Sequence, residues 1–186
     1  MNRTERYNKI AGKAKNKSSE IIERLGIKAN DKILEIGVGG GYYAEVFSDL
    51  VGVGGLYYGA DTSDEFLENL IKINQKMNNN NIRILKIEDN IIPKPDKKID
   101  LIFTRNVYHH LSNREKYFEK LHEFLEKDGK IVIIDYNERF SLARLFGHYT
   151  KSKVIITEMQ RANYLLKAEY NILEGQSFFV FERNDN

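Results

Sequence analysis

The sequence contains no cysteine, no tryptophan and only two prolines among its 186 residues. Without cysteine the chain has no disulfide scaffold, thiolate metal site or catalytic thiol. The absence is also compatible with a reducing compartment, and we expect a cytoplasmic protein. No apolar run approaches the roughly 18–20 residues that a membrane span needs, and the N-terminal MNRTERYNKI lacks the apolar stretch of a signal peptide. We therefore expect no transmembrane segment.

The chain also lacks a large excess of charge of either sign. Lys and Arg number 29 and Asp and Glu number 27, so the formal net charge is +2. This balance predicts no general attraction to nucleic acid or to a membrane. Residues 1–17 are locally basic, with six basic residues and one acid. That segment could steer an anionic substrate or touch lipid headgroups, although a solvated helix face explains it as well.

The composition is typical of a globular protein, with 41% hydrophobic and 30% charged residues. We expect a single domain over residues 1–186, in which a helical segment, 1–30, precedes an α/β core, 31–186. Hydrophobic periodicity predicts helices over 4–25, 42–50, 64–77, 113–126 and 152–165, and strands over 32–36, 56–60, 82–87, 100–104, 130–135, 166–172 and 177–181. Two pairs, Thr62 with Glu65 and Ser112 with Glu115, have the spacing of capping boxes.

Strands that alternate with helices and end in a hairpin predict a doubly wound, mostly parallel sheet with an antiparallel edge. Ligands bind such sheets beyond the carboxyl ends of the strands. The first of these ends is rich in glycine, since EIGVGGG (residues 35–41) precedes a predicted helix. Glycines allow a tight turn and close ligand approach, and the helix N-terminus attracts negative charge.

Two other nucleotide-binding patterns compete for this loop. No Lys-Ser or Lys-Thr follows the glycines, which excludes a P-loop. A dinucleotide GxGxxG that starts at Gly37 fails at Tyr42, and one that starts at Gly39 would end at Ala44, deeper in the helix. An NAD-binding site is therefore disfavoured but stays open.

Polar residues also follow the next strands. Asp61 lies 24 positions after Gly37, close to the spacing at which an acid meets ribose hydroxyls, with helix capping as the alternative. Glu88-Asp89-Asn90 follows the third strand, where an acid could accept from an exocyclic amine or form a turn before Pro93. The fourth strand leads into Thr104-Arg105-Asn106 and then VYHHL.

Together, ILEIGVGGG, YGAD, the segment 88–93 and VYHHL resemble the class I S-adenosylmethionine-dependent methyltransferases, most closely the small type 11 group. The resemblance covers the chain from about residue 5 onward. It implies a Rossmann-like, three-layer αβα fold whose seven-stranded sheet has an antiparallel last strand. It also implies S-adenosyl-L-methionine as cofactor and S-adenosyl-L-homocysteine as product.

The resemblance further implies which residues bind the cofactor. Glu35 and the glycine loop would hold the amino-acid end, Asp61 the ribose and Asp89 the adenine amine. Glu88 stands where the family has glycine, which puts the register around Asp89 in doubt. The full implied set is Glu35, Gly37, Gly39, Gly41, Asp61, Thr62, Asp89, Asn90, Arg105 and Asn106.

Methyl transfer from a sulfonium is an in-line displacement of an activated group, so the protein contributes positioning and, for a protonated nucleophile, a general base. His109 is the candidate base and His110 the second, because histidine titrates near neutrality, although packing would also explain the pair. Asp135 ends the fifth strand, where a capping role would explain it. Candidate substrate contacts are Tyr7, Tyr42, Tyr136 and His148.

We expect no metal, because no acid–histidine spacing supports a site at His109, His110 and His122. No Asn-Pro-Pro-Tyr follows the fourth strand, which argues against DNA-amine and glutamine methylation, and we expect no RNA-recognition domain or nucleic-acid partner. A small-molecule or lipid-like methyl acceptor remains by elimination. An NAD-dependent oxidoreductase and a non-catalytic binding module stay open as alternatives, and the sequence does not reveal the oligomeric state.

Overall fold

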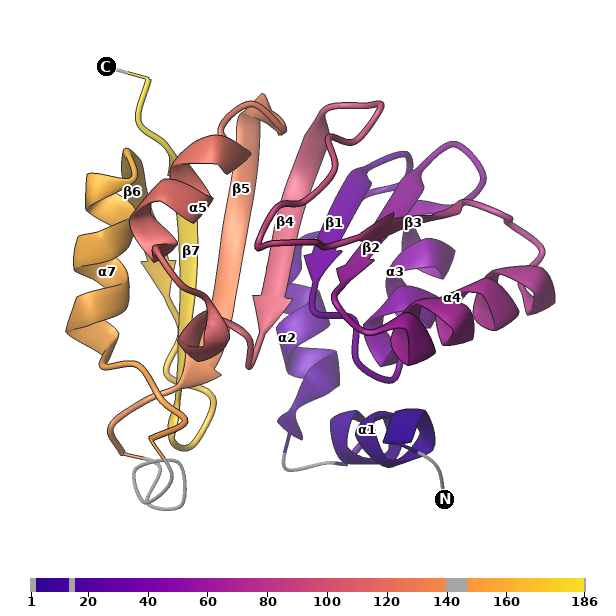
Figure 1. Ribbon diagram of the computed structural model, residues 1–186, viewed down its shortest axis with the longest axis horizontal. Coiled ribbons are helices and arrows are strands. Elements are labelled where there is room, and N and C mark those ends of the chain that lie inside the picture. The colour runs from indigo at the N-terminus through magenta and orange to yellow at the C-terminus, as the bar shows by residue number, and fades with distance from the viewer. Residues whose placement is uncertain (1–2, 14–15, 140–146, 186) are drawn as a thin grey trace. The chain divides into compact units, whose positions relative to one another are not determined.

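The computed structural model describes residues 3–13, 16–139 and 147–185, and the chain divides into two compact units, Met1–Ile99 and Asp100–Asn186. The first unit alternates helices with three strands (Figure 1). Its elements are α1 (Arg3–Ala11), α2 (Ser18–Leu25), β1 (Lys32–Ile36), α3 (Tyr42–Val51), β2 (Leu56–Asp61), α4 (Asp64–Lys76) and β3 (Ile82–Lys86).

The three strands of the first unit run parallel. β2 lies between β1 and β3, with Lys32 opposite Leu56 and Tyr57 opposite Ile82. α3 packs against β1 and β2, and α4 packs against β2 and β3. Each of these helices buries one apolar stripe, which in α4 includes Phe66, Leu70 and Ile73.

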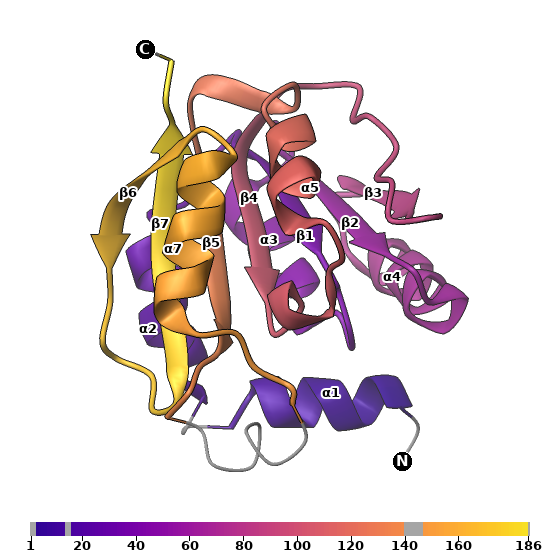
Figure 2. The ribbon, with the colours of Figure 1, turned by 60° about the vertical axis from the view of Figure 1, so that its left-hand side comes forward.

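The described residues of the second unit form two α-helices and four strands. Its elements are β4 (Ile99–Arg105), the short 3₁₀ turn η2 (Tyr108–His110), α5 (Arg114–Leu121), β5 (Leu125–Tyr136), α7 (Ser152–Arg161), β6 (Tyr164–Glu169) and β7 (Gln176–Arg183). α5 and α7 pack side by side (Figure 2). β7 lies between β5 and β6 and runs antiparallel to both.

The strand order of the whole sheet is β3-β2-β1-β4-β5-β7-β6. The predicted fold class is confirmed: the protein has a doubly wound, mostly parallel seven-stranded sheet whose last strand is antiparallel. Continuous apolar runs suit its inner strands, because residues 131–134 of β5 and 178–181 of β7 are all buried. The single domain over residues 1–186 stays a prediction.

Three helix predictions ran too long. Residues 4–25 form two helices instead of one, because the chain leaves helical geometry after Ala11 and Lys17 has a left-handed φ of 48°. The helix predicted over 113–126 ends at Leu121, and β5 starts at Leu125 rather than at Lys130. The helix predicted over 152–165 ends at Arg161.

The last of these errors has a local cause. Asn163 has a φ of 65°, a left-handed geometry that stops the helix. Tyr164 then starts β6 and pairs with Arg183 of β7. The hairpin itself is confirmed, although its first strand runs over 164–169 instead of 166–172.

Both predicted capping boxes are wrong. The residue that precedes α4 is Ser63 rather than Thr62, and the residue that precedes α5 is Asn113 rather than Ser112. Neither of these two residues makes a side-chain capping bond. Within the described part of the chain, no helix combines the length and apolarity needed to cross a membrane.

Candidate active site

The glycine-rich loop lies between β1 and α3 in the first unit. Gly37, Gly39 and Gly41 all have left-handed backbone geometry, with φ of 82°, 52° and 86°. At Gly41 a Cβ atom would also come within 2.5 Å of Ile73 Cδ1. The loop therefore needs glycine at these positions, and the backbone N–H groups of the three glycines donate to Ala60 O, Asp61 Oδ2 and Val38 O.

Side chains of α1 lie against this loop. The ring of Tyr7 would lie 3.8 Å from a Cβ on Gly39, and it packs edge-on against Phe66 with ring centroids 5.6 Å apart. Tyr7 is still 46% exposed. Tyr42 begins α3 and packs edge-on against Tyr43. The structure thus brings Tyr7 to the glycine loop, while Tyr42 packs on its helix neighbour.

Asp61 faces the same loop from the end of β2. Its Oδ2 accepts a hydrogen bond from the backbone N–H of Gly39 at 3.4 Å, and its Oδ1 accepts one from the N–H of Ser63 at 2.9 Å. The side chain also supports the start of α4, and Asp61 is only 8% exposed. Two carboxylate oxygens offer about four acceptor positions, so capacity remains for a further donor. Thr62 is exposed, and its carbonyl accepts from Lys86 Nζ.

Glu35 is almost completely buried on β1, with 3% of its surface exposed. The hydroxyl of Tyr57 donates to Glu35 Oε2 at 2.5 Å. Burial raises the pKa of Glu35 from 4.5 to about 8; the Tyr57 hydrogen bond opposes this rise, and the nearby charge of Asp61 adds to it. Glu35 therefore holds a proton at neutral pH, which a cationic group near it would displace.

Asp89 and Asn90 form a tight turn after β3. Both have left-handed geometry, with φ of 48° and 61°, and Glu88 and Ile91 exchange backbone hydrogen bonds across the turn. Asp89 is exposed. The turn explains why short polar residues occur here, because Asp and Asn tolerate positive φ better than most side chains.

Arg105 and Asn106 end β4 in the second unit, and both are tied to β7. Arg105 Nη2 donates to Gln176 Oε1 at 3.3 Å, and Gln176 Nε2 donates to Asn106 Oδ1. The backbone N–H of Asn106 donates to the carbonyl of Ile134. Sequence reasoning missed Gln176, since nothing in the sequence pairs a residue near the C-terminus with the end of β4.

The second unit brings three predicted site residues together beside Asp135. The Nδ1 of His109 lies 2.7 Å from Asp135 Oδ1, and the backbone N–H of His109 donates to Asp135 Oδ2 at 2.8 Å. The His109 ring lies 6.2 Å from that of Tyr136 and 5.7 Å from that of His148, between centroids. Asp135 therefore orients His109 rather than merely ending a strand.

His110 packs against His109, with ring centroids 4.0 Å apart and ring planes tilted by 46°. Burial lowers the pKa of His110, and the adjacent His109 and His148 lower it further. His122 lies apart from these three residues, because its Nε2 bonds the carbonyl of Ala162 and its ring packs 4.3 Å from that of Tyr164. The three histidines considered as a metal site from the sequence, His109, His110 and His122, therefore do not form a cluster.

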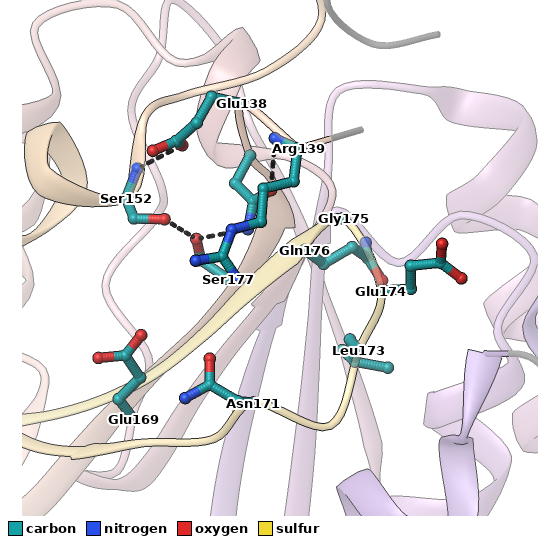
Figure 3. Close-up of a pocket in the computed structure, with 11 residues that line it drawn as sticks. Glu138, Arg139, Ser152, Glu169, Asn171, Leu173, Glu174, Gly175, Gln176 and Ser177 are labelled. Carbon is teal, nitrogen blue, oxygen red and sulfur yellow. Dashed lines mark hydrogen bonds between the residues drawn. The ribbon is translucent and has the colours of Figure 1, made fainter. Parts of the chain in front are cut away.

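A hollow of about 430 Å³ lies in the second unit, at the ends of β5 and β6 (Figure 3). Along one wall, Glu138 accepts from the backbone N–H of Ser152, whose hydroxyl bonds that of Ser177. Glu169 and Glu174 add two further carboxylates, against the single cation of Arg139. The hollow is therefore polar and acidic, which suits a small polar cation better than an apolar group.

Comparisons with known proteins agree with this geometry. A family described as "Methyltransferase domain" matches residues 9–169. A solved S-adenosylmethionine-dependent methyltransferase from Aquifex aeolicus has a TM-score of 0.77 at 24% identity and covers 88% of this chain and 87% of its own. That likeness shows the fold. The chain belongs to the methyltransferase-domain family, within the class I S-adenosylmethionine-dependent methyltransferases.

Two curated relatives, both methyltransferases, are similar in sequence to large parts of this chain. An uncharacterized methyltransferase of Bacillus subtilis, YcgJ, is 28% identical over 62% of this chain and 45% of its own length. The phosphoethanolamine N-methyltransferase of Plasmodium falciparum is 27% identical over 82% of this chain and 58% of its own. The chain thus spans about half the length of these relatives.

Proposed function

We propose that this protein transfers a methyl group from S-adenosyl-L-methionine to a small polar acceptor and releases S-adenosyl-L-homocysteine. The observation that carries the proposal is the contact between the Gly39 N–H and the Asp61 carboxylate, which sets a glycine-rich backbone bend beside a buried acid. The family match supports the same reaction.

The residues of the first unit fit this cofactor. The glycines allow a ligand to approach the backbone of the loop closely, and Asp61 keeps acceptor capacity for a ribose diol. Glu35 and the loop would hold the amino-acid end, and Thr62 would lie beside the adenine. Bound there, S-adenosylmethionine supplies an electrophilic methyl group on a positively charged sulfur.

The remaining cofactor contacts are proposed from the family resemblance. Asp89 would accept from the adenine amine and Asn90 would give a backbone contact. The exposure of Asp89 leaves its carboxylate open to such a donor. Arg105 and Asn106 would border the methionine moiety. Their bonds to Gln176 fix both side chains before any ligand binds.

We infer that His109 accepts the proton of the acceptor when that nucleophile arrives protonated. Its Nδ1 lies 2.7 Å from Asp135 Oδ1, so the tautomer that donates from Nδ1 to this carboxylate has Nε2 as its proton acceptor. A carboxylate in this position also stabilises the imidazolium that forms after proton transfer. Tyr136 and His148 neighbour this ring and are the proposed acceptor contacts in the second unit. Tyr7 and Tyr42 remain proposed contacts in the first.

A small polar acceptor is favoured over a lipid-like one. The acidic lining of the hollow at Glu138, Glu169 and Glu174 suits an amine. Four of the curated relatives are named phosphoethanolamine N-methyltransferases, and their substrate carries an amine. We therefore propose an amine-bearing metabolite as the acceptor class.

Isothermal titration with S-adenosylmethionine, S-adenosylhomocysteine and NAD tests the cofactor. We expect the first two to bind and NAD not to bind. Equal or tighter binding of NAD would reverse the assignment in favour of an oxidoreductase.

A screen of amine metabolites with a radiolabelled methyl donor then tests turnover. Cofactor binding without labelling of any acceptor would favour a non-catalytic binding module.

Replacing Asp61 tests the contact that carries the proposal. Asp61→Ala should weaken S-adenosylhomocysteine binding by about 1.5–3 kcal/mol, because a charged hydrogen-bond partner is lost. Asp64→Ala is the matched control: Asp64 is exposed and pairs with Lys86 at the surface, so affinity should hardly change. An unchanged dissociation constant in folded Asp61→Ala would remove Asp61 from the site.

A further inference from the structure

Three of the four histidines of the chain meet in one place. His109 and His110 come from η2, and His148 comes from the segment before α7. One ring nitrogen of each lies within 4.8 Å of the corresponding nitrogen of the other two. The ring centroids of His110 and His148 are 5.6 Å apart and nearly perpendicular, at 87°. Three imidazoles from two distant segments therefore point at a common volume.

One of the three rings is already held in a metal-binding orientation. The His109 side chain is only 5% exposed, and that of Asp135 is fully buried. Asp135 contacts both the ring Nδ1 and the backbone N–H of His109, which leaves Nε2 as the nitrogen available to a ligand. Metal-ligating histidines almost always donate their second ring nitrogen to a carboxylate, a carbonyl or water, and this bond fixes the tautomer and the ring.

The other two rings are free to adjust. His110 and His148 are exposed, and no hydrogen bond of either ring is found among the residues that the structure describes. In a tetrahedral zinc site with Zn–N bonds of about 2.0–2.1 Å, ligand nitrogens lie about 3.3 Å apart. Small rotations of two exposed side chains would close the present spacing to that value.

We propose that His109, His110 and His148 form a binding site for a divalent transition-metal ion, with zinc as the best match, and that Asp135 orients the His109 ligand. Three neutral imidazoles form the donor set that zinc takes in open sites, where water occupies the fourth position. Imidazole also disfavours magnesium and calcium, which prefer oxygen ligands. A bound ion would occupy the same Nε2 that His109 would use as a base, so metal binding and proton acceptance exclude each other at that atom.

The test uses the full chain without a histidine tag, stripped with a chelator and titrated with Co²⁺ in the absence of any methyl donor. We expect one equivalent to bind with the intense visible absorption of four-coordinate cobalt, and Zn²⁺ to displace it. Binding is measured without cofactor, so its failure would leave the methyltransferase proposal untouched.

Single substitutions assign the ligands. His148→Ala and His110→Ala should each abolish the visible bands and weaken binding at least tenfold. His122→Ala is the matched control, because His122 lies outside the cluster and should retain full binding. Asp135→Asn should keep the bands but weaken affinity about 10–100-fold, as expected for loss of an orienting carboxylate.

Several results would overturn the proposal. These are absence of the bands in the parent protein, undiminished binding in His148→Ala, or an equal loss in His122→Ala. Because Asp135 is buried, circular dichroism must show that Asp135→Asn is folded. If it is not folded, the exposed His110 and His148 variants decide the matter by themselves.

Discussion

At the scale of single residues, two acids in the first unit occupy contrasting environments. Asp61 accepts hydrogen bonds from two backbone N–H groups. Glu35 is almost completely buried and accepts a hydrogen bond from the Tyr57 hydroxyl. Burial raises its pKa to about 8. Glu35 should therefore be protonated at neutral pH, and a cationic ligand beside it would favour its ionised form.

Glu35 should make the stability of the free protein depend on pH. The carboxyl ionises near pH 4.5 in the unfolded chain and near 8 in the folded one. Between these values the folded state keeps a proton that the unfolded state has released. The free energy of unfolding should thus fall as pH rises, by up to about 1.4 kcal/mol per pH unit, and level off above the folded pKa.

Urea unfolding of the wild type and of Glu35→Gln across this interval measures the effect. The variant cannot ionise, so its stability relative to the wild type should increase with pH. Glu45→Gln, at an exposed position on α3, is the matched control. A difference between Glu35→Gln and the wild type that stays constant with pH would contradict the burial argument.

At the scale of elements, the loop between β1 and α3 depends on its last glycine. Gly41 precedes α3 with a φ of 86°, and its missing side chain leaves room for Ile73 of α4. The backbone bend and the packing of α4 are thus coupled through one position. Elsewhere in the unit, Gly52 ends α3 with a φ of 67°, and a Cβ added there would have no atom within 4 Å among the described residues.

These two glycines form a matched pair for a stability test. Gly52→Ala should lower the free energy of unfolding by about 1–3 kcal/mol, the backbone penalty of a positive φ with a ψ of −169°. Gly41→Ala should lower it by about 2–5 kcal/mol, because overpacking against Ile73 adds to the penalty of its left-handed geometry. Urea unfolding measures both, and equal losses would show that Ile73 moves aside without penalty.

At the scale of the whole molecule, the proposed cofactor should stabilise the fold by mass action. A ligand present at about 100 times its dissociation constant adds about 2.7 kcal/mol to the free energy of unfolding. For a chain of this size, that corresponds to a rise in melting temperature of about 5–11 °C. Thermal unfolding with S-adenosylhomocysteine and with NAD measures it. We expect a rise with the first and none with the second; a rise with NAD alone would contradict the assignment.

Much of the architecture was predictable from local patterns. Continuous apolar runs such as residues 131–134 predict inner strands, and these residues are buried. The spacing of apolar residues in α4 likewise predicts its packed face. Element ends were less predictable. The stop of α7 depends on the left-handed geometry of Asn163 and on pairing of Tyr164 with β7, and neither is encoded in hydrophobic spacing.

The sequence by itself determined the alternation of strands and helices, the glycine loop and the acid that follows β2, because each depends on residues close together in the chain. Only the tertiary structure decided that Asp135 holds His109 and that His148 joins the pair, because these contacts link segments separated by 26 and 39 positions. A histidine cluster assembled from separate segments leaves no spacing signature. Its chemistry therefore appears only when the strands and turns that carry it have folded together.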